Sequence, residues 1–389
     1  MIQNNMNHYP EITSDTFKIS PSIVRLSERF SALPAIREVD RHGFRDTLIG
    51  LSAQCLQAWT LGQSWALPQK LRLPRRVIFA GVGGSAIGAD VVATYARLFS
   101  PISVEVTRDY SLPPLDKDCL VLACSFSGET EEAIKPFQAA AAAGAMCLAI
   151  TTGGTLQEEA LRLGQPCLTY SWSGTPRSAI GYGVFLPLAI LSRLGLFEIS
   201  DDDIQSVIAD LMQLSDQWEL SVIDDAVTLP ALIAGEMLER IPLIVGSGFL
   251  EVAARRWAGE LAENSKRLAV PVAVPEFNHN LLEGAVADAL RYQTNETSDP
   301  WFVILLDASP AHPRNRLRVS ITRKHFENAG RKAWHVDVGG KTPLQSIMRA
   351  CSLGSWVSFY LALFSKVDPT KVDILAQFKR DIALANEGD

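Results

Sequence analysis

Short apolar runs alternate along this chain with longer segments in which apolar residues recur at helical spacing. An apolar run, a glycine-rich turn and a helical pattern follow one another in VIFAGVGGSAIGADVVATYARLF, and the same theme returns in CLVLACSFSGETEEAIKPFQAAAAAGAMCLAITT. Further strands are predicted over ISVEVTRDY and PCLTYSW. Nearly continuous apolar strands that alternate with helices are typical of a parallel sheet covered on both faces.

The second half of the chain repeats this order. IPLIVGSGFLEVAARRWAGELAE again predicts a strand, a glycine turn and a helix, and later strands are predicted in WFVILLDASPAHPRNRLRVSITRKHFENAG and WHVDVGG. Helices are expected over 36–62, in the apolar stretch that contains Pro187, and on both sides of Pro369. The pattern therefore predicts an α/β protein with two related domains. The expected divisions are a tail and helix (1–65), a first domain (66–205), a second domain (206–365) and a C-terminal helix (366–389).

Composition narrows the class of protein. Of the 389 residues 47% are hydrophobic and 20% are charged, which is typical of a globular protein. The net charge of -7 argues against a general nucleic-acid surface, so an anionic ligand would need local cations or backbone amides. The six cysteines form no CxxC pair, and the polar N-terminus has no signal pattern. We therefore expect a cytoplasmic protein with free thiols, no metal and no contact with membranes.

The first glycine turn has two interpretations. Gly81, Gly83 and Ala86 fit the relaxed dinucleotide fingerprint GxGxxG/A, and Glu105 lies about where a ribose-binding acid is expected. A nicotinamide or flavin oxidoreductase is therefore one candidate. The other interpretation is a tight turn that needs glycine for its backbone geometry alone.

The second turn, in VLACSFSGET, favours a phosphate site. Ser125, Ser127 and Thr130 surround Gly128 at the start of the next helix. Hydroxyl donors, free amides and the positive end of a helix dipole together bind an anion, whereas a simple helix cap needs only one such residue. The acidic residues that follow are expected to face solvent: Glu129, Glu131 and Glu132. TTGGTL (151–156) would lie at the same edge of the sheet.

These turns carry a resemblance to a known family. GVGGS, SFSGET and TTGGTL resemble the signature of the sugar isomerase (SIS) domain, a doubly wound, flavodoxin-like parallel sheet that binds phosphosugars. TPRSAIGY, RRWAGELAENSK, PEFNHNLLEG, GSWVSFYLAL and VDPTKVDILAQFK resemble the bifunctional phosphoglucose/phosphomannose isomerase family. The resemblance implies two SIS-type domains and a phosphate site formed by Gly84, Ser85, Ser125, Ser127 and Thr130.

The family chemistry interconverts an aldose and a ketose phosphate through a cis-enediol, without a metal or redox cofactor. The resemblance assigns the base to Glu263, with Glu260 as a natural control. His279 would help to open the sugar ring from the neighbouring subunit of a homodimer. Arg177 would stabilise the enediolate, and Lys379 in the final helix would assist ring opening when that helix packs at the active site.

Three functions thus remain open on the sequence alone. The first is isomerisation of glucose, fructose and mannose 6-phosphates, and the second is a phosphosugar sensor on the same fold that performs no chemistry. The third is the dinucleotide-dependent oxidoreductase. Amino-sugar phosphate isomerisation would need a nitrogen source, and the sequence has no recognisable glutaminase domain. The long N-terminal extension has no assigned role.

Overall fold

A computed structural model describes residues 11–12, 19–220, 222–223, 226–293 and 299–386. The chain forms two compact units, which are described separately below. Unit 1 comprises the described residues of Met1–Asp46, Asp216–Gly339 and Ala350–Asp389, and unit 2 comprises Thr47–Ser215 and Gly340–Arg349. The four chain-order divisions expected from the sequence stay a prediction.

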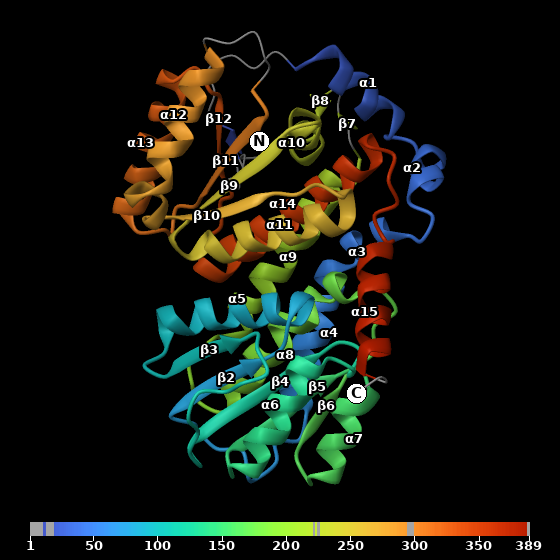
Figure 1. The fold of residues 1–389 in the computed structure, drawn as a ribbon, viewed down its shortest axis with the longest axis vertical. Coiled ribbons are helices and arrows are strands. Elements are labelled where there is room, and N and C mark those ends of the chain that lie inside the picture. Colours follow the sequence, from blue (N-terminus) through green and yellow to red (C-terminus); the bar gives the residue numbers. More distant parts are fainter. Residues whose placement is uncertain (1–10, 13–18, 221, 224–225, 294–298, 387–389) are drawn as a thin grey trace, which may run out of the picture. The chain divides into compact units, whose positions relative to one another are not determined.

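Unit 2 is built on a five-stranded parallel sheet (Figure 1). Its strands are β2 (Arg76–Ala80), β3 (Ser103–Thr107), β4 (Cys119–Ser125), β5 (Met146–Thr151) and β6 (Cys167–Thr169). They lie in the order β3-β2-β4-β5-β6, so the chain first steps to one side of β2 and then crosses to the other. This is the flavodoxin-like order, with its switch point between β2 and β4.

Helices pack against this sheet because its central strands are apolar on both faces. All residues of β4 and β5 are buried. One face packs against Ile134 and Phe137 of α6 and Leu156 of α7. The helices of unit 2 are α4 (Leu51–Ser64), α5 (Gly83–Phe99), α6 (Glu131–Ala142), α7 (Gly154–Arg162), α8 (Ile180–Arg193) and α9 (Asp201–Trp218), with a short 3-10 turn, η1 (Pro176–Ser178). The predicted buried helix around Pro187 is confirmed as α8.

Unit 1 repeats the strand order of unit 2. Its strands are β1 (Glu11–Ile12), β9 (Ile241–Ser247), β10 (Val270–Val274), β11 (Trp301–Asp307) and β12 (Ala333–Asp337). Strands β10-β9-β11-β12 are parallel and follow the same sequence of steps, while β1 adds an antiparallel edge beside β12. The predicted α/β class and the loose internal repeat are therefore confirmed.

Unit 1 also contains the following elements outside its sheet (Figure 1). They are α1 (Pro21–Arg29), α2 (Leu33–Val39), the pair β7 (Val222–Ile223) and β8 (Ala226–Val227), α10 (Leu229–Met237), η2 (Gly248–Leu250), α11 (Glu251–Ser265), η3 (Glu276–His279), α12 (Leu281–Gln293), α13 (Pro313–Asn328) and α15 (Asp373–Asn386). The N-terminal extension contributes to this core, because Phe30 is fully buried beside Phe364 and Ile23 packs over Gly235 of α10.

Helix α14 (Pro343–Phe364) is long and apolar enough to cross a membrane, but its apolar window is completely buried inside the structure. In unit 1 it packs so closely on α11 that a Cβ on Gly354 would lie 2.3 Å from the indole ring of Trp257. The Trp257 indole N–H also donates a 2.7 Å hydrogen bond to the carbonyl of Ala350. The burial indicates that α14 is a core helix.

The single helix expected over 36–62 is wrong. The structure contains α2, then α3 (Phe44–Ile49), then α4. The break follows Asp40, whose carboxylate accepts hydrogen bonds from the amides of Phe44 and Arg45, and Gly43 has a left-handed φ of 70°. A local cap and a left-handed glycine thus override the helical periodicity.

Candidate functional site

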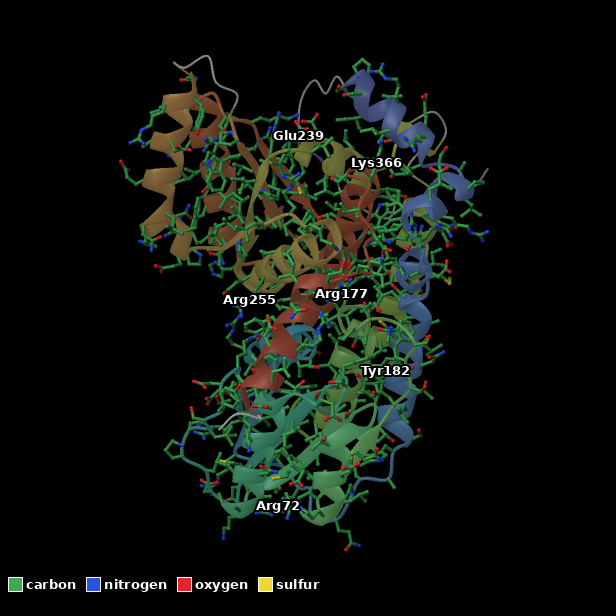
Figure 2. The ribbon with its side chains drawn as sticks, turned by 45° about the vertical axis from the view of Figure 1, so that its right-hand side comes forward. Arg72, Arg177, Tyr182, Glu239, Arg255 and Lys366 are labelled. Atoms are coloured by element: carbon green, nitrogen blue, oxygen red, sulfur yellow. The ribbon has the colours of Figure 1, made fainter. Side chains whose placement is uncertain are left out.

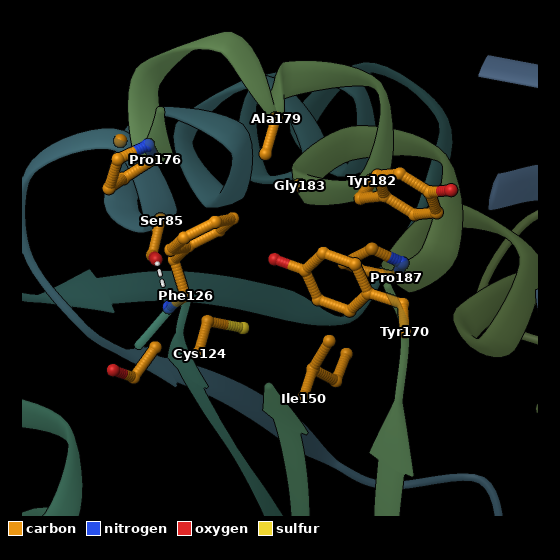
Figure 3. Close-up of a pocket in the computed structure, with 12 residues that line it drawn as sticks. Ser85, Cys124, Phe126, Ile150, Tyr170, Pro176, Ala179, Tyr182, Gly183 and Pro187 are labelled. Carbon is orange, nitrogen blue, oxygen red and sulfur yellow. Dashed lines mark hydrogen bonds between the residues drawn. The ribbon is translucent and has the colours of Figure 1, made fainter. Parts of the chain in front are cut away.

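The first two glycine turns of unit 2 meet at the switch point of its sheet. The Phe126 amide donates a 3.2 Å hydrogen bond to the Ser85 hydroxyl, which joins the turn after β4 to the turn after β2 (Figure 3). A Cβ on Gly81 would lie 2.5 Å from the Cys124 carbonyl oxygen, so only glycine allows this approach. The first amides of α5, which begins at Gly83, have no partner within that helix and face the same edge.

Hydroxyl groups of the second turn form a short hydrogen-bond chain. The Gly128 amide donates to the Ser125 hydroxyl at 3.0 Å, and that hydroxyl donates to the Thr130 hydroxyl oxygen at 2.8 Å. Ser125 is only 2% exposed, so its proton is used inside the turn. Ser127 accepts from the Glu129 amide at 3.2 Å. The hydroxyl protons of Ser127 and Thr130 therefore remain to be donated to a ligand, and Ser125 orients Thr130.

The third turn packs directly on the second. A Cβ on Gly128 would lie 1.9 Å from the carbonyl oxygen of Gly153, and the Leu156 amide donates to the Gly128 carbonyl at 2.9 Å. Glu129 is exposed, as predicted, and its carboxylate also accepts 2.6 and 2.9 Å hydrogen bonds from the hydroxyl and amide of Thr155. These bonds lower the pKa of Glu129 below its ordinary value. The carboxylate is thus directed toward the third turn.

Arg177 lies beside the first turn. It belongs to η1, which the Ser178 hydroxyl supports by donating to the Thr175 carbonyl at 2.8 Å. A Cβ on Gly84 would lie 3.2 Å from the Cα of Arg177, so the two backbones are almost in contact. Arg177 is 5% exposed, and Figure 2 labels it together with Tyr182 of α8. Unit 2 therefore brings Arg177 and the predicted phosphate turns to one edge of its sheet.

A small cavity lies between the first two turns, η1 and the start of α8 (Figure 3). Its walls include Ser85, Cys124, Phe126, Ile150 and Tyr170. The Tyr170 hydroxyl points into it. The cavity volume of about 20 Å³ is enough for one water molecule and far too small for a hexose. A sugar phosphate bound to the turns would therefore lie outside this cavity.

Glu105 does not lie where a ribose-binding acid is needed. It occupies the middle of β3, opposite Ile78, and its carboxylate accepts from the Ser103 hydroxyl at 3.3 Å and lies 4.0 Å from Arg76 Nε. The carboxyl edge of the sheet, where a dinucleotide would bind, is two residues further on. This geometry argues against the oxidoreductase interpretation. Across the described ranges, His, Cys, Asp and Glu side chains form no group of three arranged to hold a metal ion.

In unit 1, Glu260 and Glu263 have different surroundings on α11. Glu260 forms a buried ion pair with Arg256 at 2.7 Å, with both side chains 3% exposed, and both its carboxylate oxygens accept from Ser355 at 2.9 Å. Glu263 is half-buried in the last turn. Glu260 is thus fixed inside the core, whereas Glu263 is accessible.

Lys266 links the end of α11 to the segment just before α15. Its ammonium group donates to the carbonyls of Glu263 at 2.6 Å, Asp368 at 3.1 Å and Lys371 at 2.7 Å. The sequence motif ENSK contains this lysine, but spacing alone could not reveal its distant partners. Lys379 lies on α15, where it is exposed. The structure thus brings the backbone of Glu263 close to the start of the helix that carries Lys379.

His279 lies at the other edge of the unit 1 sheet. It ends η3, directly after β10, and its side chain is exposed. Because β9 and β10 are parallel, α11 must run back from the carboxyl edge to the amino edge between them. Glu263, in the last turn of α11, therefore lies on the order of 15–20 Å from the carboxyl edge. One copy of unit 1 does not bring Glu263 and His279 together.

Comparison with known proteins decides the family. A bifunctional phosphoglucose/phosphomannose isomerase of Caldicellulosiruptor bescii is 33% identical over 336 residues, which cover 85% of this chain and 97% of that protein. The chain belongs to the bifunctional phosphoglucose/phosphomannose isomerase family. A member from Aquifex aeolicus is 28% identical over 79% of this chain and 90% of its own length.

Family models agree with this membership, and a solved structure has a similar fold. The model for the bacterial phospho-glucose isomerase C-terminal SIS domain matches residues 227–382, and the SIS domain model matches residues 70–164. A hypothetical protein from Thermus thermophilus has a similar fold, with a TM-score of 0.71 and 15% identity over 97% of this chain and 100% of that one. The predicted family is confirmed, and the two SIS-type domains are confirmed with it.

Proposed function

We propose that this chain catalyses the reversible aldose–ketose isomerisation of hexose 6-phosphates, interconverting glucose 6-phosphate and fructose 6-phosphate and also accepting mannose 6-phosphate. The observation that carries the proposal is the 33% sequence identity to the Caldicellulosiruptor bescii enzyme, which extends over 97% of that protein. The hydroxyl-rich turns of unit 2 support it, because they offer neutral donors to a phosphate on a chain with a net charge of -7. The chain is thus an isomerase of the phosphosugar type.

The phosphate would be bound by the first amides of α5, at Gly84 and Ser85, and by the hydroxyls of Ser127 and Thr130. Ser125 would act from inside the turn by fixing the Thr130 hydroxyl. These donors are held in place before the ligand arrives, so little reorganisation is needed when it binds.

Chemistry would pass through a cis-enediol. Glu263 would remove the proton from C2 of the open-chain aldose and return it to C1, while a hydroxyl proton moves between O1 and O2. Arg177, fixed beside the phosphate turn, would stabilise the negative charge that develops on the enediolate oxygens. Lys379, at the end of the tail that Lys266 anchors near Glu263, would assist ring opening. These steps use no redox cofactor and no metal.

A homodimer would complete each site, with His279 supplied by the neighbouring subunit for ring opening. The distance between Glu263 and His279 within one copy supports this arrangement, because opposite edges of one sheet cannot serve one small substrate. We place the enzyme in the cytoplasm, acting on small molecules without nucleic-acid or membrane partners. We also retain the domain divisions at 66–205 and 206–365.

The test is a coupled assay with each hexose 6-phosphate offered separately. The proposal predicts turnover of glucose 6-phosphate and fructose 6-phosphate, and formation of fructose 6-phosphate from mannose 6-phosphate. Binding of all three without turnover would instead indicate a phosphosugar sensor. Thermal stabilisation by NAD(P) or a flavin, with none by fructose 6-phosphate, would favour the oxidoreductase.

A further inference from the structure

A glutamine of α4 holds the backbone next to Arg177. Gln54 is 1% exposed, and its side-chain amide makes one hydrogen bond to the end of η1 and one to the start of α8. Its Nε2 donates to the Ser178 carbonyl at 3.0 Å, and its Oε1 accepts from the Gly181 amide at 2.6 Å. A Cβ on Gly181 would lie 2.6 Å from that Oε1, so the close contact requires glycine.

The bond from the Gly181 amide replaces a local helix cap. Helix α8 begins at Ile180, and its N-cap residue, Ala179, has no side chain that could accept a hydrogen bond. The first amides of a helix need outside acceptors, and here Gln54 provides one from another helix. Its second bond fixes the carbonyl of Ser178, the residue that follows Arg177 in the chain. One side chain therefore determines where η1 ends and α8 begins.

On its other side, the Arg177 backbone contacts the first glycine turn, which contains Gly84 and is part of the predicted phosphate site. A Cβ on Gly84 would lie 3.0 Å from the Pro176 carbonyl oxygen and 3.2 Å from the Arg177 Cα. The Trp172 indole also donates to the Ser178 hydroxyl at 3.1 Å. A shift of this segment would consequently change the position of the guanidinium group relative to the turn.

We propose that Gln54 is a positioning residue for the isomerisation, and that it acts by fixing Arg177 against the phosphate turn. This inference rests on the proposed function, in which Arg177 stabilises the enediolate. It gives the α4 helix, which precedes the first SIS sheet in the chain, a direct part in building the site. Gln54 itself need not touch the substrate.

The experiment compares Gln54→Leu, Arg177→Met and the double variant with the wild-type chain. Since misplacement by about 1 Å can cost roughly 100-fold in rate, we expect Gln54→Leu to lower kcat about 10- to 100-fold, with KM for fructose 6-phosphate changed less than about threefold. In the Arg177→Met background the same change should have almost no further effect on kcat. Gln57→Leu is the matched control, because Gln57 lies one turn along α4 and accepts its 3.0 Å hydrogen bond from the Tyr182 hydroxyl of α8.

Gln54→Glu provides a second variant in case Gln54→Leu folds poorly. The carboxylate keeps the acceptor for Gly181 but loses the donor to Ser178, and protonation restores that donor. We expect the kcat of Gln54→Glu, relative to wild type, to increase as the pH falls. A pH-independent ratio contradicts the proposal.

The outcomes separate this inference from the proposed function. An inactive wild-type chain overturns both. An active wild-type chain in which Gln54→Leu keeps its kcat overturns the positioning role alone. Equal losses of kcat from Gln54→Leu in the wild-type and Arg177→Met backgrounds also overturn it, because Gln54 would then act independently of Arg177.

Discussion

Replacing Gly128 by alanine should separate the phosphate turns from one another. Gly128 has a left-handed φ of 78°, and an added Cβ would lie 1.9 Å from the Gly153 carbonyl oxygen. No side-chain rotation relieves this clash, because the backbone fixes the position of the Cβ and the other atom is a backbone carbonyl oxygen. The second and third turns must therefore move apart, which weakens the hydrogen bonds that the Leu156 and Thr152 amides donate to the second turn.

The magnitude follows from two contributions. Left-handed backbone costs an alanine about 1–2 kcal/mol, and two weakened hydrogen bonds cost about 0.5–1.5 kcal/mol each. Gly128→Ala should therefore reduce the free energy of unfolding by about 2–5 kcal/mol. Gly144→Ala is the control: its φ is 74°, but nothing lies within 4 Å of the added Cβ. Only the backbone cost of about 1–2 kcal/mol applies there.

Urea unfolding would measure both variants, and calorimetric titration with fructose 6-phosphate would measure binding. We expect Gly128→Ala to bind at least about tenfold more weakly, which is about 1.4 kcal/mol, because the Ser125–Thr130 hydroxyl chain shifts with the turn. Gly144→Ala should bind like wild type. Equal stability losses for the two variants, or unchanged binding by Gly128→Ala, would refute the role of the packed turns.

Three further predictions concern the second turn and unit 1. The hydrogen bonds from Thr155 lower the pKa of Glu129 in the folded protein. The ionised carboxylate therefore stabilises the fold above the ordinary pKa of 4.5, and this stabilisation is lost as the pH falls through the lower pKa of the folded state. The urea midpoints of wild type and Glu129→Gln should converge below that lower pKa. Glu260→Gln should cost about 3–5 kcal/mol in urea unfolding, because it breaks a buried ion pair, and a loss under about 1 kcal/mol would contradict that assignment. Lys266→Met should lose about 1 kcal/mol of tail anchoring and speed chymotryptic cleavage at Phe378 about fivefold, whereas Lys366→Met should leave that rate unchanged.

Apolar runs predicted the central strands that are buried on both faces, and also the less buried edge strands β3 and β6 of unit 2. β4 and β5 could be found from VLACS and MCLAIT because every residue faces packed side chains. β10 was missed because it contains Pro271, which argues against a strand in the sequence, whereas its place at the sheet edge accommodates a proline. The helical periodicity over 36–62 gave no sign of the Asp40 cap that divides it.

For the candidate site, spacing identified the hydroxyl cluster but not how its members divide the work. Ser125 and Thr130 both carry a hydroxyl, so the sequence does not distinguish them. The Ser125 hydroxyl donates its proton to Thr130 within the turn, whereas the Thr130 hydroxyl can donate its proton to a ligand. The contact of Gln54 with the Arg177 segment joins residues far apart in the chain, so no local pattern could reveal it. Glu260 and Glu263 are likewise separated only by their surroundings.

The most direct test of the central claim is solvent hydrogen exchange at C2 of the sugar. Wild type and Glu263→Gln would be incubated with fructose 6-phosphate in D2O, and deuterium at C2 of the glucose 6-phosphate formed would be followed by NMR. We expect wild type to form glucose 6-phosphate that carries deuterium at C2, and Glu263→Gln to do so about 100- to 10,000-fold more slowly while still binding fructose 6-phosphate. Exchange by Glu263→Gln at the wild-type rate would show that another group moves this proton.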